Sequence, residues 1–573
     1  MVTERRAGLG MDEALGEALV EGAFLTREQV NEALRQSRAN GVKLSDWLIE
    51  QKLISPETLA TVLSFQLNVP VVELKQFQVQ PEAISLVPES FAREHNVLPL
   101  SVEGDTLRVA MEEPQDLQTI DALAGLTRKR IRPVLPLRGG IKELIDANYK
   151  PTSRIAEELK AMAPPPPPPR VTAVRREPLL EPEVVAQAPV VRAVDMILNQ
   201  AIKDRASDIH IVPSEEDLKV FYRIDGSLRE AVSLPQGVHN ALISRIKVMA
   251  NMDIAERRRP QDGQFSANVE GREVNFRVAT AETRNGEMMV LRVLDKATSL
   301  LQLSELGLLP GPLQAFNTLL QSPFGMIMVS GPTGSGKTTT LYAALNQLIG
   351  GDKNIMTIED PIEYYLPGVN QIQVNRQADI TFPVGLRAIM RLDPDIILVG
   401  EIRDSETATT AVQAALTGHL VLTSIHANDS VAALTRLIDM GIDPFLISSA
   451  VIGSVAQRLV RRVCPYCQTL ATVSPAEALA YERELGENRT EFYIGRGCNF
   501  CSQTGFRGRV GVFEVLVLSS EIRGLIARRA SAEQIKEQAI KEGMITLRRD
   551  GMLKAKDGIT TPGEVIRNVF TIE

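Results

Sequence analysis

The sequence is poor in aromatic residues and long apolar runs, and each shortage excludes a class of protein. Phe, Trp and Tyr make up 4% of the 573 residues, and the formal net charge is −8. A protein that binds nucleic acid regardless of sequence needs clustered Lys and Arg and stacking aromatic rings, so this balance argues against a nucleic-acid partner. No run of about 18 apolar residues occurs, and polar residues follow Met1, so we expect a cytosolic protein without a membrane span or secretory leader.

Cysteine is also scarce, and all four cysteines have the spacing of metal ligands. Cys464 and Cys467 form one CxxC pair, and Cys498 and Cys501 form the other. Four thiolates in two such pairs can surround Zn²⁺ tetrahedrally, which we prefer to a disulfide framework. A redox dithiol is the alternative, although it needs a single CxxC pair on a βαβ unit. We therefore expect a structural zinc site.

The length of the chain exceeds that of one hydrophobic core and predicts about three or four domains. Composition and patterns divide the chain into an N-terminal regulatory or docking domain (1–150), a Pro-rich linker (151–189), an α+β domain (190–295) and an α/β domain (304–573) with a cysteine-bearing insertion (462–505). The linker includes six consecutive prolines, which favour a stiff polyproline II spacer. A recognition site for a proline-binding domain is the alternative.

The N-terminal domain contains an internal repeat at a shift of 29 residues. Each copy predicts two short helices, with Thr26 and Ser55 as N-caps and Pro56 at the first helical position. A strand is expected at residues 106–110. The matching apolar positions are Leu15, Leu19, Phe24, Leu25 and Val30 in the first copy and Leu44, Leu48, Leu53, Ile54 and Leu59 in the second.

The α+β domain begins with a helical pattern from residue 190 and continues with strand patterns at 207–211, 218–224, 274–278 and 288–293. A basic cluster, residues 257–259, and the following residues 260–263 are expected in a loop. A solvated surface is the simplest explanation for one or two of these three arginines.

A glycine-rich stretch that matches G-x-x-x-x-G-K-[ST] follows an apolar run at 326–329 and precedes a helical pattern that stops at Gly350. In this strand-loop-helix context, backbone N–H groups can turn toward phosphate oxygens, Lys337 can reach the β- and γ-phosphates, and Thr338 can ligate Mg²⁺. A chance glycine-rich turn is the alternative. The expected ATP-binding residues are Gly331, Pro332, Thr333, Gly334, Ser335, Gly336, Lys337, Thr338 and Thr339.

Further strands are expected at 354–358, 395–399 and 420–424, alternating with helices. This order predicts a mostly parallel sheet covered on both faces, whose carboxyl edge binds ligands. Polar residues lie at the strand ends: Glu359, Asp360 and Glu363 after the first, Glu401 and Arg403 after the second, and His419 and His426 flanking the third. ATP hydrolysis needs a carboxylate that orients water, another that holds Mg²⁺, and cations for the transition state. Singly, such acids are often helix caps and a lone His is often structural, but their convergence predicts catalysis.

These motifs resemble the Walker A, Asp, Walker B and His boxes of the type II secretion and type IV pilus ATPase superfamily. The resemblance rests on residues 331–338, 357–363, 392–404 and 417–426, and extends to 206–211, 259–263 and the cysteines. It implies a RecA-like P-loop core, a preceding α+β (PAS-like) domain, a zinc-knuckle insertion and a helical or mixed N-terminal domain. ATP and Mg²⁺ are the implied substrate and cofactor.

The resemblance also implies roles for single residues. Glu363 would be the catalytic base, and Glu401 would hold Mg²⁺ through water. His419 and His426 would sense nucleotide and link neighbouring subunits. The smaller domain would contribute arginine fingers, for which Arg277 is the first candidate and Arg292 the second, while Gln264 stands where many relatives have an arginine.

The tetracysteine insertion and the long front region resemble the assembly branch of this superfamily. The implied protein is a homohexamer that works with an inner-membrane platform protein and a docking protein in building a pilus or a secretion pseudopilus. A retraction motor, a nucleic-acid translocase with the same core and a nucleotide-binding module without turnover are the alternatives.

The repeat resembles paired motifs that bind cyclic di-GMP. Ala14 and Lys43 replace the arginine of that motif, and Ala23 and Lys52 replace a later glycine. These changes remove guanidinium contacts and close backbone approach, so they favour loss of the dinucleotide with retention of the fold.

Overall fold

The structure, a computed structural model, describes most of the chain and divides it into two compact units. The first is built mainly from the N-terminal 150 residues and the second from almost all of the remainder. No described helix combines the length and apolar character that a membrane crossing requires. The described residues are 11–22, 24–40, 44–51, 53–55, 58–59, 62, 64, 69–72, 77, 79–111, 114, 116–136, 141–149, 188–269, 272–295, 301–350 and 352–570.

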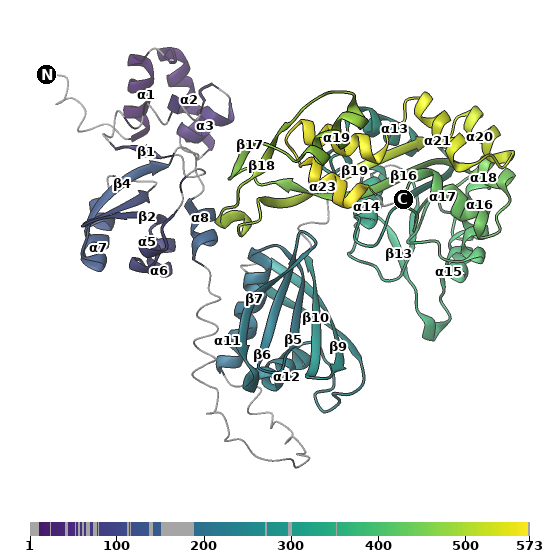
Figure 1. Cartoon of the computed structure of the whole chain (residues 1–573), viewed down its shortest axis with the longest axis horizontal. Helices are drawn as coiled ribbons and strands as arrows, with labels where there is room; N and C mark the ends of the chain where they lie inside the picture. The colour runs from purple at the N-terminus through teal and green to yellow at the C-terminus, as the bar shows by residue number, and fades with distance from the viewer. Residues whose placement is uncertain are drawn as a thin grey trace. The chain divides into compact units, whose positions relative to one another are not determined.

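The N-terminal repeat forms helices, labelled in Figure 1: α1 (Met11–Glu21), α2 (Arg27–Asn40) and α3 (Leu44–Glu50). Of the five matched positions in each copy, four are buried in one core and one, Phe24 or Leu53, is exposed, so the two copies bury the same pattern. The predicted caps are confirmed, since Thr26 Oγ1 accepts from Gln29 N at 3.3 Å and Ser55 Oγ from Thr58 N at 3.2 Å. Ala23, Lys43, Lys52 and Pro56 lie outside the described residues.

A small mixed sheet follows in the first unit, and it includes the strand expected at 106–110. Its strands lie in the order β1 (Val71–Val72), β4 (Arg130–Pro136), β3 (Thr106–Met111) and β2 (Val97–Glu103). Its helices are α5 (Pro81–Leu86), α6 (Glu89–Glu94), α7 (Leu117–Thr127) and α8 (Ile141–Asn148). Leu98, Leu100, Leu107 and Val109 are buried in the core that the sheet shares with these helices.

The first part of the second unit is an antiparallel six-stranded sheet. Helices α11 (Ala188–Lys203) and α12 (His239–Met249), the latter preceded by η1 (Gln236–Val238), share its core with alternate strand residues such as Ile209, Ile211 and Phe276. The side chains between them lie on the opposite face. The strand order is β7 (Ser227–Pro235), β6 (Asp217–Ile224), β5 (Ala206–Pro213), β10 (Gly286–Asp295), β9 (Arg272–Thr283) and β8 (Gln261–Val269).

Two expectations for this region were wrong in detail. Helix α11 begins at Ala188, inside the predicted linker, whose residues 151–187 lie outside the described part. Gln261, Asp262 and Gly263 belong to β8 and not to a loop, because they pair in register with β9. Tertiary pairing thus overrides the weak strand propensity of Asp and Gly. The arginines at 257–259 do lie in a loop.

A seven-stranded sheet forms the second part of this unit, and it is mostly parallel as expected. Every neighbouring pair is parallel except β16 and β19. β13, β16 and β19 were not predicted. The strand order is β13 (Asn370–Gln373), β12 (Ile355–Glu359), β14 (Ile396–Val399), β15 (Leu420–Ile425), β11 (Gly325–Ser330), β16 (Val451–Val463) and β19 (Phe506–Val517).

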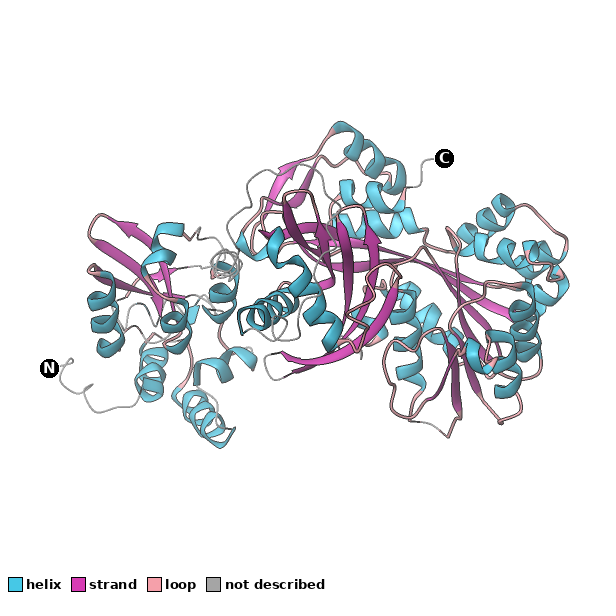
Figure 2. Cartoon of the chain, turned by 90° about the horizontal axis from the view of Figure 1, so that it is seen from below, coloured by secondary structure: helices cyan, strands magenta, loops and turns pink. Residues whose placement is uncertain are grey.

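Helices cover both faces of this sheet, as Figure 2 shows in cyan beside the magenta strands. Met326 and Met328 of β11 pack into the core shared with α15 (Phe382–Ile389), α16 (Ser405–Leu416), α17 (Ser430–Asp439) and α18 (Pro444–Ala450). Ile327 and Val329 pack into the core shared with α13 (Pro310–Leu320) and α14 (Lys337–Leu348). Burial on both faces explains why residues 326–329 of this strand are apolar without interruption.

The remaining elements lie around β16 and β19. Between these strands come β17 (Gln468–Thr472), α19 (Pro475–Leu485), β18 (Glu491–Gly495) and η5 (Asn499–Cys501). A capping box of Ser474 and Glu477 starts α19. The chain continues with α20 (Ser520–Ala527), α21 (Ala532–Lys541), α22 (Leu547–Lys556) and α23 (Pro562–Val569).

Candidate active site and metal centre

The glycine-rich stretch, residues 331–338, forms the expected phosphate loop between β11 and α14. Gly334 and Gly336 have φ angles of 76° and 88°, a left-handed conformation that glycine adopts at little cost. Helix α14 begins directly afterwards at Lys337, so the free N–H groups of its first turn and its positive dipole end lie at the loop. This arrangement is suited to binding a phosphate group.

Lys337 lies over the loop that precedes it. Its Nζ donates to the carbonyl oxygens of Gly331 at 2.9 Å and Pro332 at 3.0 Å. Burial lowers the pKa of Lys337, and the nearby carboxylate of Glu401 opposes that shift. The ammonium group is therefore held at the loop, where phosphate oxygens would compete with these two carbonyl oxygens for its hydrogen bonds.

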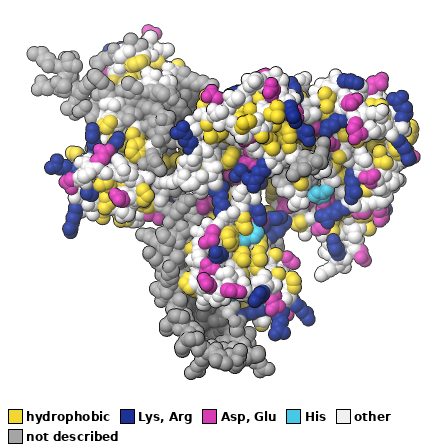
Figure 3. Space-filling view, viewed as in Figure 1, with side chains coloured by type: hydrophobic (Ala, Val, Ile, Leu, Met, Phe, Trp, Pro, Cys, Tyr) yellow, Lys and Arg dark blue, Asp and Glu magenta, His cyan; other side chains and the backbone are white. Residues whose placement is uncertain are grey.

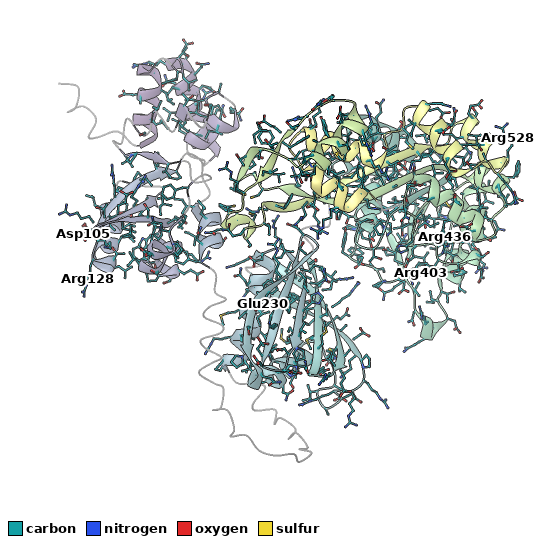
Figure 4. All side chains as sticks on the ribbon, in the orientation of Figure 1. Asp105, Arg128, Glu230, Arg403, Arg436 and Arg528 are labelled. Carbon is teal, nitrogen blue, oxygen red and sulfur yellow. The ribbon has the colours of Figure 1, made fainter. Side chains whose placement is uncertain are left out.

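Acidic residues gather at the carboxyl edge of the parallel strands. Glu401 follows β14, and its Oε2 lies 3.5 Å from Nε2 of His426, which follows β15. Arg403, labelled in Figure 4, pairs with Glu401, and this hydrogen bond raises the pKa of the guanidinium group. Strands β12, β14, β15 and β11 are neighbours, so Glu363, Glu401, His426 and the phosphate loop all follow adjacent strands.

His419 does not belong to this group within the chain, contrary to the expectation that the strand ends would bring it there. It precedes β15, and the parallel register pairs Leu420 with Gly325, the first residue of β11. His419 therefore lies at the amino edge of the sheet, opposite the phosphate loop. Its Nδ1 lies 2.9 Å from the carbonyl oxygen of Ala414, at the end of α16.

Two of the acids of the Asp box, Glu359 and Glu363, have different surroundings. Glu359 is 3% exposed and accepts from Thr357 Oγ1 at 2.6 Å, from Gln371 Nε2 at 3.1 Å and from the Tyr342 hydroxyl. Burial first, and then the charge of Glu359, raises the pKa of Tyr342. The Glu363 side chain is 31% exposed. The carboxylate of Glu359 is thus buried and engaged in hydrogen bonds with its neighbours, whereas that of Glu363 is accessible to solvent.

The two candidate finger arginines are cross-strand neighbours with different partners. Arg277 of β9 donates to Glu363 Oε2 at 3.1 Å and to the carbonyl oxygen of Ile362 at 2.6 Å. Arg292 pairs with Arg277 in the β10–β9 register, but its Nε donates to Asp208 Oδ1 at 3.1 Å. Its side chain is 60% exposed. The structure therefore brings Arg277, and not Arg292, to the acids of the seven-stranded sheet.

Sequence reasoning missed one buried residue at the phosphate loop. Gln457 of β16 hydrogen-bonds to Ser335 in the loop and to Thr340 in the first turn of α14. No motif signals it, because it lies 122 residues beyond Ser335 on a strand that was not predicted.

The four cysteines lie together. Their Sγ atoms are all within 4.8 Å of one another, and Cys498 Sγ is 3.7 Å from Cys501 Sγ. A tetrahedron of thiolates with Zn–S bonds of about 2.3 Å has sulfur-to-sulfur edges of about 3.8 Å. Cys464 and Cys501 are buried, and Cys467 and Cys498 are half-buried. The donor set and its size therefore fit a tetrahedral zinc ion.

Comparison with known proteins assigns the chain to a family. A family model described as type II/IV secretion system protein matches residues 183–567, more than half of the chain. The chain belongs to this family. It is an ATPase with the α/β, RecA-like core of secretion ATPases, as expected. The match includes the six-stranded sheet, the phosphate loop, Glu363, Glu401 and the cysteines. An MshEN domain model matches residues 67–155, which follow the N-terminal repeat.

Individual members of the family are similar to this chain over most of its length. The type IV pilus assembly ATPase PilB of Myxococcus xanthus is 41% identical over 562 residues, which cover 97% of this chain and 99% of the relative. Type II secretion system protein E of Aeromonas hydrophila is 42% identical over 85% of this chain and 97% of the relative. The X-ray structure of the Yersinia pseudotuberculosis ATPase DotB is similar in fold, with a TM-score of 0.50, 19% identity, and coverage of 70% of this chain and 96% of that chain.

Proposed function

We propose that this ATPase converts ATP hydrolysis into assembly of a type IV pilus or a type II secretion pseudopilus, acting through an inner-membrane platform protein. The observation that carries the catalytic part is the contact between Arg277 of the six-stranded sheet and Glu363 in the loop that follows β12, at the carboxyl edge of the seven-stranded sheet. The relatives named as a pilus assembly ATPase and as type II secretion protein E support the cellular part.

In the proposed mechanism, the phosphate loop and Lys337 bind the β- and γ-phosphates of ATP. Thr338 and Glu401 would hold Mg²⁺, which neutralises charge on the phosphates. Glu363 orients a water molecule and accepts its proton as the water oxygen bonds to the γ-phosphorus and ADP leaves. Arg277 would stabilise the charge that develops on the γ-phosphoryl group.

Motion would arise from the same contacts. Arg277 belongs to the six-stranded sheet and Glu363 to the seven-stranded sheet, so a γ-phosphate between them would draw the two sheets together. Product release would let them part, a hinge movement of a known kind. We place the hinge at residues 296–303, of which 296–300 lie outside the described residues. We also propose a homohexamer at the cytoplasmic face of the inner membrane, in which His426, at the carboxyl edge, senses nucleotide and His419, at the amino edge, links neighbouring subunits.

The proposed domains follow this division of labour. Residues 1–150 would regulate or dock the motor, 151–189 would be a linker, 190–295 would supply arginine to the nucleotide, and 304–573 would hydrolyse ATP. The cysteines would hold a structural Zn²⁺ ion that staples the insertion at 462–505. Metal analysis of the purified full chain should find about one zinc per chain. Absence of zinc under reducing conditions would contradict this assignment.

Two observations on cyclic di-GMP point in opposite directions. The MshEN match favours binding, whereas the substitutions at Ala14, Ala23, Lys43 and Lys52 remove contacts from the repeat. We propose that the dinucleotide is not bound. Isothermal titration of the full chain tests this, and micromolar binding would overturn it.

Deletion of the gene in its host tests the cellular proposal. We expect loss of surface pili or of secreted substrates. Excess pili would indicate a retraction motor. Loss of DNA movement with intact pili and secretion would indicate a nucleic-acid translocase, which the surface does not favour, since acidic and basic side chains are interspersed on the face in Figure 3.

A further inference from the structure

Strand β16 runs next to the strand that leads into the phosphate loop. β11 and β16 are parallel, and Ser330, the last residue of β11, pairs with Ala456. In the chain, Ser330 is followed by Gly331, which opens the loop, and Ala456 is followed by Gln457, which is 2% exposed. Gln457 is therefore a buried polar side chain at the start of the phosphate loop.

The amide of Gln457 joins two parts of the nucleotide-binding segment. Its Nε2 donates to the carbonyl oxygen of Ser335 at 2.8 Å, and its Oε1 accepts from Thr340 Oγ1 at 2.6 Å. The two partners require one orientation of the amide, because a carbonyl oxygen can only accept. Ser335 lies within the loop and Thr340 in the first turn of α14. The side chain thus fixes the loop relative to the helix that follows it.

The loop also lies too close to Gln457 to move toward it. A Cβ atom at Gly331 would be 2.6 Å from the carbonyl oxygen of Gln457, and one at Gly336 would be 2.8 Å from its Nε2. Both separations are shorter than normal contacts. Glycine at these two positions therefore allows the loop to pack against Gln457, at Gly331 against its backbone carbonyl and at Gly336 against its side-chain amide.

The neighbouring residue extends this support to the loop that follows β15. Arg458 Nη2 donates to the carbonyl oxygen of Asn428 at 2.8 Å, two residues beyond His426. Ser330 Oγ donates to the carbonyl oxygen of Asp429 at 3.2 Å, which joins the end of β11 to the same loop. One dipeptide of β16 therefore contacts both loops at the carboxyl edge.

We infer that Gln457 is a positioning residue for ATP binding, which acts through Ser335 and Thr340 and does not touch the nucleotide. The inference rests on the ATPase activity and goes beyond the motif residues. A positioned loop presents its N–H groups to phosphate without reorganisation, so loss of positioning weakens nucleotide binding more than it slows the chemical step.

Gln457→Met in the full chain gives the sharpest test, because it preserves side-chain volume and removes both hydrogen bonds. We expect about tenfold weaker binding of a fluorescent ATP analogue and a similar rise in KM, as two buried hydrogen bonds are lost, with kcat at saturation lowered by less than about threefold. Gln413→Met is the matched control, since Gln413 is exposed on α16, and its binding and KM should equal those of the wild type.

Two further variants keep the inference testable if Gln457→Met does not fold. Thr340→Val removes one of the two contacts at nearly constant shape, and KM should rise by about threefold. Gln457→Glu retains the acceptor for Thr340 but places a carboxylate oxygen against the carbonyl of Ser335, so binding should be weaker than in Gln457→Met.

Three results would overturn the inference: wild-type binding in Gln457→Met, unchanged KM in Thr340→Val, or a fall in kcat at unchanged KM. Binding of the fluorescent analogue is measured without turnover, so the inference about Gln457 can fail while the proposed function stands, and the reverse. A wild-type chain that binds and hydrolyses ATP but drives no assembly would contradict only the latter.

Discussion

The seven-stranded and six-stranded sheets supply charged groups to the candidate active site in different ways. The parallel sheet places them in loops after strands, where Glu363 and Glu401 each lie in a recognisable motif. The antiparallel sheet places them within strands, where Arg277, Arg292 and Asp208 form one cross-strand row that the neutral Gln264 continues. The role of a loop residue can be identified from its motif, whereas the role of a residue in a cross-strand row depends on the strand register and on the side chain that it contacts.

The two arginines of the row show how much the partner matters. Arg277 and Arg292 face the same way on adjacent strands, yet Arg277 contacts Glu363 and Arg292 contacts Asp208. We therefore expect the parallel sheet to determine binding and chemistry and only one arginine of the antiparallel sheet to contribute strongly.

The largest effect is expected from Lys337→Ala, at the start of helix α14 beside the parallel sheet. Loss of the ammonium group should weaken ATP binding by about 100-fold and abolish measurable turnover, because charged hydrogen bonds to phosphate are lost. Equilibrium binding of a fluorescent ATP analogue measures this. Binding within threefold of the wild type would place the phosphates elsewhere.

Glu363→Gln should separate binding from chemistry. We expect nearly normal ATP affinity with kcat lowered about 1,000-fold, since an amide cannot accept the proton of water. Phosphate-release kinetics measure kcat. Glu359→Gln is the matched control, because the hydrogen bonds of Glu359 to Tyr342, Thr357 and Gln371 indicate a structural role. A reversed pattern, with Glu359→Gln the slower enzyme, would transfer the role of base to Glu359.

Arg277→Gln tests the contribution of the antiparallel sheet. We expect kcat to fall about 100-fold, as in the loss of one donor that stabilises transition-state charge, with a smaller rise in KM. Single-turnover hydrolysis separates the chemical step from product release. If kcat is unchanged, the contact with Glu363 is structural and the comparison between the sheets fails.

The smallest effect is expected from Arg292→Gln. Its exposed side chain is held by Asp208 away from the acids of the parallel sheet, so kcat should change by less than about threefold and the melting temperature only slightly. The same hydrolysis assay makes it the control for Arg277→Gln. An equal loss in both variants would mean that both arginines reach the nucleotide.

The sequence predicted well where a local pattern encodes the structure. The four strands around the phosphate loop, the helix α14 and the caps at Thr26 and Ser55 all appear where they were expected. The first three residues of β8 were assigned to a loop because Gln-Asp-Gly has weak strand propensity, and β13, β16 and β19 were missed. His419 was expected near the acids although it precedes the strand predicted at 420–424, and a residue before a parallel strand lies at the opposite edge of the sheet from the residues that follow the strands.

The sequence by itself determined the chemistry available to this protein: a phosphate loop, two motifs with acidic residues and four thiolates at metal-binding spacing. Such motifs depend on short-range geometry, and their residues lie close together in the chain. Only the tertiary structure decided which side chains meet. Glu359 is buried and hydrogen-bonded to its neighbours, Arg277 and Arg292 differ in the acid that each contacts, and the pairing of β16 with β11 places Gln457 against the phosphate loop. The contacts of Arg277 with Glu363 and of Gln457 with Ser335 join residues far apart in the chain, and no local pattern encodes them.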